Sequence, residues 1–388
     1  MATGGAATAI SAPVIFDGTR FLEDHCLITQ SGLVTQLLAT SDCAPDIARI
    51  TLTSGILAPG FIDLQVNGGG DLMFNNNPYR AALGTMFAAH RRTGTTAMMP
   101  TLISDTPAQQ ELAVAAVREA IAGDDPGILG IHLEGPFFAS ARRGAHRADM
   151  IRPSTDDDIA WLCTLADLRV IVTLAPELAA AGQIGKLSKS GIHVCAGHSN
   201  ATRQQMVAAV AEGMAGVTHL YNAMSQLTPR EPGVVGATLE EKTLWAGIIA
   251  DGHHVHPANI RLAHESKPPG RLLLVTDAMA TVGGTKTSFS LYGETISARD
   301  GKLVNEEGVL AGSAIGMIDA VAYAANTVGI PLAESLRMAS LYPAAVLKLD
   351  HQRGRIAPGY RADLVHFDEQ YRVHNTWVGG LRQTHYKH

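Results

Sequence analysis

The sequence is poor in cysteine, in clustered positive charge and in long apolar runs. Its 4 cysteines lack C-x-x-C spacing and are too few for a disulfide framework in 388 residues, so they are interpreted as reduced core thiols. Its 30 basic residues are scattered against 36 acidic ones, which argues against nucleic-acid and membrane partners. No run of 18 uncharged apolar residues exists, and no basic residue precedes Arg20. These absences predict a cytoplasmic protein with a small-molecule ligand.

The remaining composition is that of a globular protein. Hydrophobic residues make up 46% and charged residues 17%, and 39 glycines and 18 prolines are close to ordinary usage, which excludes disordered and fibrous classes. A chain of 388 residues predicts two domains, or one large α/β barrel with an addition.

Eight short apolar or β-branched runs alternate with longer helical segments between residues 60 and 277. Such runs suit parallel strands that are buried on both faces, and residues 107–122 and 201–213 are typical crossover helices. Eight β/α units favour a (β/α)8 TIM-like barrel over an open doubly wound sheet. The predicted strands are residues 60–67, 95–102, 128–134, 169–177, 192–199, 216–220, 245–252 and 271–277.

The two ends of the chain differ from this pattern. Residues 1–57 and 352–388 are rich in Val, Ile, Thr and turn residues, and segments 354–368 and 373–380 are typical of hairpin strands. The sequence therefore predicts a small β domain built from both termini, with a barrel domain over residues 58–351.

Three potential metal ligands end three of the predicted strands. Glu134, His198 and His219 offer one carboxylate and two imidazoles, a ligand set typical of catalytic Zn²⁺. Each histidine alone is more often an ordinary strand-end residue bonded to a carbonyl. Because the carboxyl ends of barrel strands converge on one mouth, the joint interpretation is favoured.

Other polar residues of the same face have two interpretations each. Asp277 ends the eighth strand and suits acid/base catalysis beside a metal, or it caps the following helix. His146, and one of His253 and His254, suit donation to substrate oxygens, although loop histidines are often plain surface residues. Arg230 lies in a proline-braced loop and suits phosphate recognition, or it is a solvated charge. The glycines at 68–70 lack the rest of a phosphate-loop motif.

Several motifs together resemble one family, the N-acetylglucosamine-6-phosphate deacetylases of the amidohydrolase superfamily. The resemblance runs in order from residue 59 to 365, and HLEGPF and THLYNAM are specific to the family rather than to the superfamily. The matching segments are PGFIDLQVNGGGD (59–71), HLEGPF (132–137), GAH (144–146), AGHSNA (196–201), THLYNAMS (218–225), PREPG (229–233), DGHHVHP (251–257), LVTDAMA (274–280), LAGSA (310–314) and GRIAPGYRADLV (354–365).

The resemblance implies a role for each matching position. It implies that each subunit binds one divalent metal ion, which is Zn²⁺ or, as alternatives, Fe²⁺, Co²⁺ or Mn²⁺. It also implies that Asp277 is the general acid/base. It implies a homodimer in which Arg230 reaches the phosphate in the partner's site. Superfamily members commonly bind a second metal through an HxH pair, and here Gln65 and Asn67 occupy those positions. The implied metal ligands are Glu134, His198 and His219, and the implied substrate contacts are His146, Asn222, Ala223, Arg230, His254 and Leu310.

The implied reaction is hydrolysis of N-acetylglucosamine 6-phosphate to glucosamine 6-phosphate and acetate. Asp277 takes the proton of the attacking water and later protonates the amine, and His146 helps the metal to stabilise the oxyanion. The alternatives are the galacto epimer as substrate, or another N-acyl or cyclic-amide hydrolase of the superfamily. A non-enzymatic barrel scaffold is disfavoured because all four metal and acid/base residues are present.

Overall fold

Eight parallel strands form the central sheet, seen here in a computed structural model that describes residues 6–385. They pair in the order β17-β16-β15-β14-β13-β12-β11-β8. A parallel bridge between Val66 and Ala278 joins the two ends of this row, so the sheet is nearly closed into a barrel. The strands are β8 (Phe61–Val66), β11 (Thr95–Ile103), β12 (Ile131–Glu134), β13 (Val170–Leu174), β14 (His193–Ala196), β15 (Gly216–Val217), β16 (Trp245–Ile248) and β17 (Leu272–Leu274).

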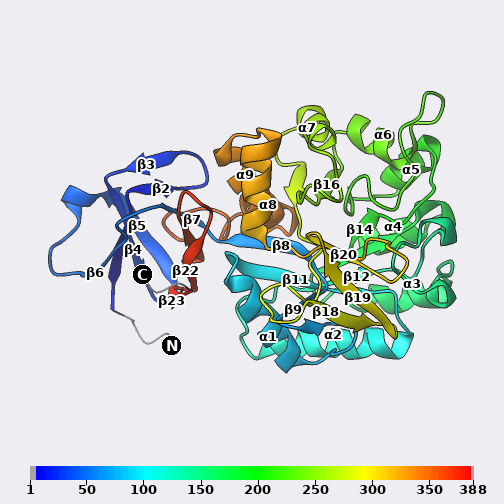
Figure 1. Ribbon diagram of the computed structural model, residues 1–388, viewed down its shortest axis with the longest axis horizontal. Helices are drawn as coiled ribbons and strands as arrows, with labels where there is room; N and C mark the ends of the chain where they lie inside the picture. The colour runs from blue at the N-terminus through cyan, green and yellow to red at the C-terminus, as the bar shows by residue number, and fades with distance from the viewer. Residues whose placement is uncertain (1–5, 386–388) are drawn as a thin grey trace.

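One helix follows each of these strands and brings the chain back for the next parallel strand, as Figure 1 shows. Threonine caps set several helix starts: Thr106 accepts from the third residue of its helix, and Thr155 and Thr202 form capping boxes. The helices are α1 (Arg80–Arg91), α2 (Pro107–Ala122), α3 (Asp156–Cys163), α4 (Gln183–Lys189), α5 (Arg203–Ala211), α6 (Gly233–Glu240), α7 (Pro257–Ser266) and α8 (Met317–Tyr323), followed by α9 (Leu332–Ala339) and α10 (Leu341–Val346).

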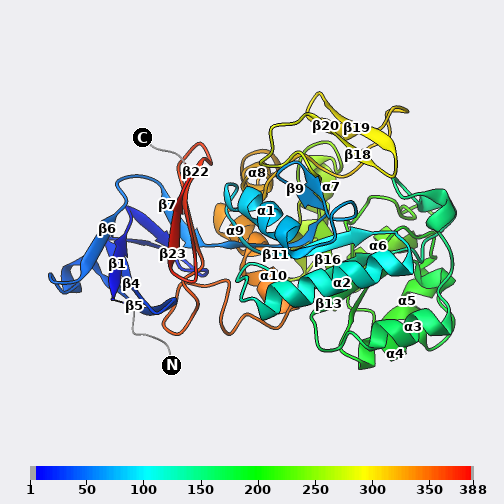
Figure 2. The same ribbon diagram turned by 90° about the horizontal axis from the view of Figure 1, so that it is seen from below.

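Strands from both ends of the chain form a separate β domain, seen as blue and red ribbons side by side in Figures 1 and 2. Its sheets have the orders β5-β4-β1-β6 and β23-β22-β21-β7-β2-β3. Residues from both termini, including Ile15, Leu27, Leu364 and Trp377, share one buried core. The strands are β1 (Thr8–Ser11), β2 (Val14–Phe16), β3 (Phe21–Glu23), β4 (His25–Gln30), β5 (Leu33–Ala39), β6 (Ala48–Thr51), β7 (Ile56–Pro59), β21 (Leu364–Phe367), β22 (Val373–Val378) and β23 (Leu381–Thr384).

This architecture confirms the predicted (β/α)8 barrel with a small β domain built from both termini. The expected junction at residues 57–58 falls inside β7, which pairs with both β2 and β21 of the small domain. The predicted strand at 216–220 is shorter in the structure, because the backbone leaves extended geometry at His219, where φ is 32°.

A small antiparallel sheet between β17 and α8 was not predicted. It comprises β18 (Ser288–Leu291), β19 (Glu294–Arg299) and β20 (Lys302–Val304), and a short hairpin of β9 (Gly68–Gly69) and β10 (Leu72–Met73) lies nearby. Leu291 and Leu303 share a buried cluster with Ile103, the last residue of β11, and with Met279, which follows β17. The added sheet therefore packs at the carboxyl end of the barrel, and Figure 2 shows it projecting from the barrel.

Within residues 6–385, no helix combines the length and the apolar character that crossing a membrane requires.

Candidate active site and metal centre

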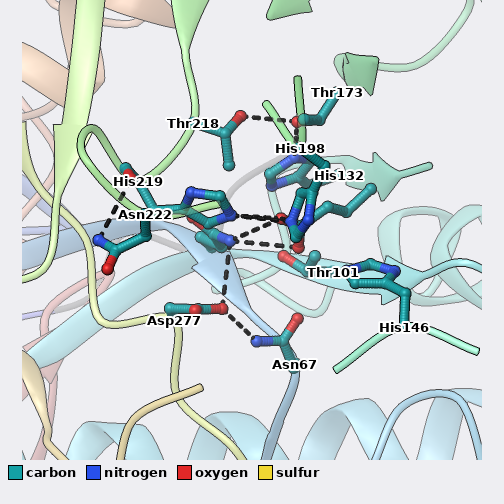
Figure 3. A network of polar contacts seen from close by, with 12 residues as sticks. Asn67, Thr101, His132, His146, Thr173, His198, Thr218, His219, Asn222 and Asp277 are labelled. Carbon is teal, nitrogen blue, oxygen red and sulfur yellow. Dashed lines mark hydrogen bonds and ion pairs between the residues drawn. The ribbon is translucent and has the colours of Figure 1, made fainter. Parts of the chain in front are cut away.

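The ends of three barrel strands, β12, β14 and β15, bring Glu134, His198 and His219 together. Glu134 is the last residue of β12, and each histidine stands two residues after the end of β14 or β15. All three side chains are buried, and their ligand atoms lie within 4.8 Å of one another. Figure 3 shows the two imidazoles turned toward a common point. The structure thus assembles the predicted metal-ligand set, although the three residues lie up to 85 positions apart in sequence.

The separations among these atoms fit a tetrahedral metal site. Glu134 Oε1 lies 3.3 Å from His198 Nε2 and 3.0 Å from His219 Nε2, and the two nitrogens are 3.1 Å apart. Ligands placed about 2.0–2.1 Å from a Zn²⁺ ion in tetrahedral geometry are roughly 3.3 Å from one another. A divalent ion therefore fits between these three atoms with little movement of the side chains.

Hydrogen bonding at the far side of the His198 ring supports the same conclusion. Nδ1 of His198 lies 2.8 Å from the carbonyl oxygen of Arg142. A carbonyl only accepts, so Nδ1 carries the proton and a neutral ring presents the Nε2 lone pair to the Glu134 carboxylate. Two acceptors facing each other at 3.3 Å repel unless a cation lies between them. The donor set therefore fits a metal.

The electrostatics of the cluster keep its carboxylate ionised. Burial alone would raise the pKa of Glu134, but its contacts with the neighbouring His198 and His219 outweigh burial and hold this pKa well below its usual value. Burial has the opposite consequence for His198, whose pKa it lowers despite the neighbouring carboxylate. An ionised carboxylate beside a neutral imidazole is the protonation state in which Glu134 and His198 bind a metal.

The amide side chain of Gln65 bridges Glu134 and Asp277, and that of Asn67 contacts Asp277. Gln65 Nε2 donates to both oxygens of Glu134 at 3.2 Å and to Asp277 Oδ1 at 3.1 Å, and Asn67 Nδ2 donates to the same Oδ1 at 2.6 Å. Because ionised carboxylates only accept, both amides must present their NH₂ groups here. An NH₂ group does not bind a cation.

Asp277 faces the cluster from the residues that follow β17, with its backbone at φ 53°. One carboxylate oxygen accepts from Asn67, as Figure 3 shows, and also from Gln65, and these two contacts fix the orientation of the group. Burial and the negative charge of Glu134 raise the pKa of Asp277 to about 6. A carboxylate in this range is suited to taking up a proton and releasing it again near neutral pH.

A cavity of about 270 Å³ opens over these residues. Most of the predicted substrate contacts line it, and of the two neighbouring histidines His254 lines it whereas His253 is exposed. Asp251 accepts from His254 Nδ1 at 2.6 Å, which leaves Nε2 of that ring available to a ligand. The predicted site residues that line the cavity are Asn67, Glu134, His146, His198, His219, Asn222, Ala223, His254, Asp277 and Leu310.

Arg230 does not join the cavity of its own chain. It lies in the loop between β15 and α6 and is exposed, and no residue of the described range 6–385 forms a hydrogen bond or ion pair with it. Its neighbour Leu227 is also exposed, at 60%. The guanidinium is therefore free to bind a group that this chain does not supply.

The Amidohydrolase family model matches residues 56–382. The chain belongs to the amidohydrolase family. Its relatives include the N-acetylgalactosamine-6-phosphate deacetylase of Shewanella sp., 42% identical, with 96% of this chain and 94% of the relative covered. The N-acetylglucosamine-6-phosphate deacetylase of Haemophilus influenzae is 34% identical, with 95% and 97% covered.

This amidohydrolase is also similar in structure to solved deacetylases. The N-acetylglucosamine-6-phosphate deacetylase from Pasteurella multocida superposes with a TM-score of 0.94 at 37% identity, with 97% of this chain and all of the other covered. A mutant of the Mycobacterium smegmatis enzyme in complex with N-acetyl-D-glucosamine-6-phosphate superposes with a TM-score of 0.89 at 31% identity, with 97% and 99% covered.

One polar network beneath the metal-ligand cluster of the amidohydrolase was missed by the sequence analysis. His132 Nε2 lies 2.7 Å from Thr173 Oγ1, which lies 2.6 Å from Thr218 Oγ1, and His132 Nδ1 lies 3.1 Å from the carbonyl oxygen of Leu64. His132 stands two residues before Glu134 on β12, so strand alternation places both side chains inside the barrel. That spacing was the available signal.

Proposed function

We propose that this amidohydrolase is a metal-dependent deacetylase that hydrolyses N-acetyl-D-glucosamine 6-phosphate to D-glucosamine 6-phosphate and acetate. The observation that carries the proposal is the buried Glu134–His198–His219 cluster with Asp277 beside it in one cavity. The names of the relatives and of the solved structures, which cover nearly the whole chain, support the substrate.

The proposed metal content is one divalent ion per subunit, held by Glu134, His198 and His219. Zn²⁺ is the first choice for a site of two imidazoles and one carboxylate, and Fe²⁺, Co²⁺ and Mn²⁺ are alternatives with the same ligand chemistry. When bound, such an ion polarises a carbonyl group and makes water a better nucleophile. The NH₂ groups of Gln65 and Asn67 argue against a second tightly bound ion.

The side chains that line the cavity have separate roles in proton transfer, oxyanion stabilisation and substrate binding. Asp277 takes the proton of the water that attacks the acetyl carbonyl carbon, and then transfers this proton to the sugar nitrogen as the C–N bond breaks. His146 donates a hydrogen bond to the carbonyl oxygen, where negative charge develops. Asn222, Ala223, His254 and Leu310 line the part of the cavity in which we place the sugar phosphate.

Arg230 completes the phosphate site in our proposal, acting in trans within a homodimer. The supporting observations are that Arg230 is exposed and that it does not line the cavity of its own chain. Two-fold symmetry would make the exchange mutual, so each subunit would donate one guanidinium and receive one. A cytoplasmic location is also proposed, and the four free cysteines of the chain agree with it.

The galacto epimer is the second candidate substrate. The relative with 42% identity is named for N-acetylgalactosamine 6-phosphate, whereas the two solved structures described above are named for the gluco compound. The two sugars differ only in the orientation of the 4-hydroxyl group, so the metal, the carboxylate and the phosphate contacts serve both.

The test is acetate release by metal-stripped protein after Zn²⁺ is restored, with four substrates in parallel: both epimers, each with and without the 6-phosphate. Fast metal-dependent hydrolysis of a phosphorylated compound supports the proposal, and the faster epimer identifies the substrate. Absence of acetate release from all four compounds by protein that has taken up one ion per chain would overturn it.

A further inference from the structure

The ring of His146 is held by a residue that no motif pointed to, Ser104, which directly follows β11. His146 Nδ1 lies 2.8 Å from Ser104 Oγ and accepts from the Ser104 backbone N–H at 3.3 Å. Both residues are buried, at 4% and 1% exposure. The serine therefore makes two contacts to the same ring nitrogen.

These two contacts determine which nitrogen of His146 carries the proton. A backbone N–H only donates, so Nδ1 must accept and must carry no hydrogen. A proton on Nδ1, in the other tautomer or in the imidazolium, would point toward the Ser104 N–H. A ring without a proton on Nδ1 carries it on Nε2.

The Nε2 atom is the one that the protein leaves for a ligand. His146 lines the cavity, and within residues 6–385 its Nε2 has no hydrogen-bond partner. Its ring packs edge-on against Phe138 and His198, with centroid separations of 5.0 and 4.5 Å, so packing fixes the ring plane as well. The result is an N–H donor of fixed direction at the metal-ligand cluster.

Two further features hold Ser104 itself. The Tyr292 hydroxyl, from the turn between β18 and β19, donates to the Ser104 carbonyl oxygen. A Cβ atom at Gly135 would lie 2.4 Å from Ser104 Oγ, so the glycine leaves the space that the hydroxyl occupies. Through Tyr292, the added three-stranded sheet is thus connected to the residue that holds His146.

We propose that Ser104, anchored by Tyr292, is a positioning residue that locks His146 in the Nε2–H tautomer, so that the ring donates to the oxygen of the scissile carbonyl. This inference rests on the proposed function of the cavity for its catalytic consequence, but the tautomer itself is a property of the protein without substrate.

The tautomer is measured directly by two-bond ¹H–¹⁵N spectroscopy of the Zn²⁺-loaded protein labelled with [¹⁵N]histidine, with His146→Gln used to assign the signals. We expect the Nε2–H form of His146 in the parent protein. The Nδ1–H form in the parent overturns the proposal, whether or not the protein releases acetate. Conversely, an Nε2–H ring in a protein that hydrolyses none of the sugar phosphates refutes the proposed function alone.

The catalytic consequence is tested with Ser104→Ala in two backgrounds. In the parent, Ser104→Ala removes the shorter, 2.8 Å contact to Nδ1 and leaves only the backbone N–H at 3.3 Å to favour the Nε2–H tautomer. We therefore expect kcat to fall about tenfold while KM changes less than about twofold, because the donor at Nε2 acts on the transition state. In the His146→Gln background, the glutamine amide presents either its NH₂ group or its carbonyl oxygen to a ligand. A glutamine has no tautomers, so Ser104 cannot act there by selecting one. Ser104→Ala should then cost less than about twofold. An equal loss in both backgrounds would show a merely structural role and overturn the proposal.

Tyr292→Phe removes only one hydroxyl and serves as the second variant, because it keeps the core contacts of the ring. We expect a smaller fall in kcat than for Ser104→Ala, again with KM nearly unchanged, and a detectable Nδ1–H population of His146. A kcat equal to that of the parent together with an unchanged histidine spectrum removes Tyr292 from the proposal. Zn²⁺ content and circular dichroism are compared with the parent for both variants.

Discussion

Asp277→Asn is the substitution that most sharply separates acid/base chemistry from binding. In the structure, Asp277 Oδ1 accepts from Asn67 Nδ2 at 2.6 Å and from Gln65 Nε2 at 3.1 Å. An asparagine of the same shape keeps an oxygen at this position, so both amide donors remain satisfied. The change removes the negative charge and the ability to take up a proton, and little else.

The expected magnitude follows from those contacts. Loss of a positioned general acid/base typically costs about 10²–10⁴-fold in kcat, or roughly 3–5.5 kcal/mol of transition-state stabilisation. Asp277 is not one of the clustered metal ligands, so metal content should stay at one ion per chain. KM should remain within about threefold, because the cavity keeps its shape.

Acetate release, elemental analysis and substrate titration measure these three quantities on the same preparation. Asp167→Asn is the matched control, since Asp167 is an exposed carboxylate that pairs with Arg118 at the surface, and the kcat of this variant should equal that of the parent. Activity of Asp277→Asn within tenfold of the parent would refute the acid/base role. Loss of the ion would instead assign Asp277 to the metal site.

Four further outcomes are expected. The Glu134→Gln variant should bind Zn²⁺ at least tenfold more weakly than the parent, because the side chain at position 134 loses its charge. Unchanged Zn²⁺ affinity would remove Glu134 from the set of metal ligands. Metal-stripped protein should recover fully with one equivalent of Zn²⁺ per chain, and a requirement for two would contradict the single-ion site. Arg230→Ala should raise KM for the phosphorylated sugar by about 10- to 100-fold and leave KM for the sugar without phosphate unchanged. Mixed dimers of one Arg230→Ala subunit and one Asp277→Asn subunit should regain one site of normal KM. If well-formed mixed dimers show no such recovery, the arginine serves the site of its own chain. Arg353→Met should lower the free energy of unfolding in urea by about 3–5 kcal/mol, since it leaves the buried Asp363 carboxylate without its main partner, and a loss below about 1 kcal/mol would contradict this account.

The barrel was predictable from the sequence because burial on both faces leaves a clear signal. Every residue of β13 and β17 is buried, and these strands appear in the sequence as nearly continuous apolar runs. The sheet of β18 to β20 left no such signal, since most of its residues are exposed or half-buried. Its position depends on a few contacts, such as those of Leu291 and Leu303 with Ile103, that join distant parts of the chain.

The candidate site likewise contains residues whose proximity the sequence predicts and residues whose contacts it does not predict. Residues that end parallel strands, such as Glu134 and Asp277, are brought together by topology alone, so the sequence pattern predicts their proximity. Ser104 also follows a strand, but its significance lies in a contact with His146, 42 residues later, and in the direction of one backbone N–H. No composition or spacing encodes such a contact, because it depends on where a loop passes.

The amides at positions 65 and 67 explain how two carboxylates are tolerated at the base of one cavity. Glu134 and Asp277 repel each other, and this repulsion contributes to the raised pKa of Asp277. Where a second cation would neutralise such a pair, Gln65 instead donates to both carboxylates and Asn67 adds a second donor to Asp277. Neutral donors orient Asp277 without removing its charge, so it remains basic enough to accept a proton. Replacing these amides by histidines would therefore do more than create a metal site. It would remove the hydrogen-bond donors that orient Asp277, and a cation bound by the new histidines would lower the basicity of the Asp277 carboxylate.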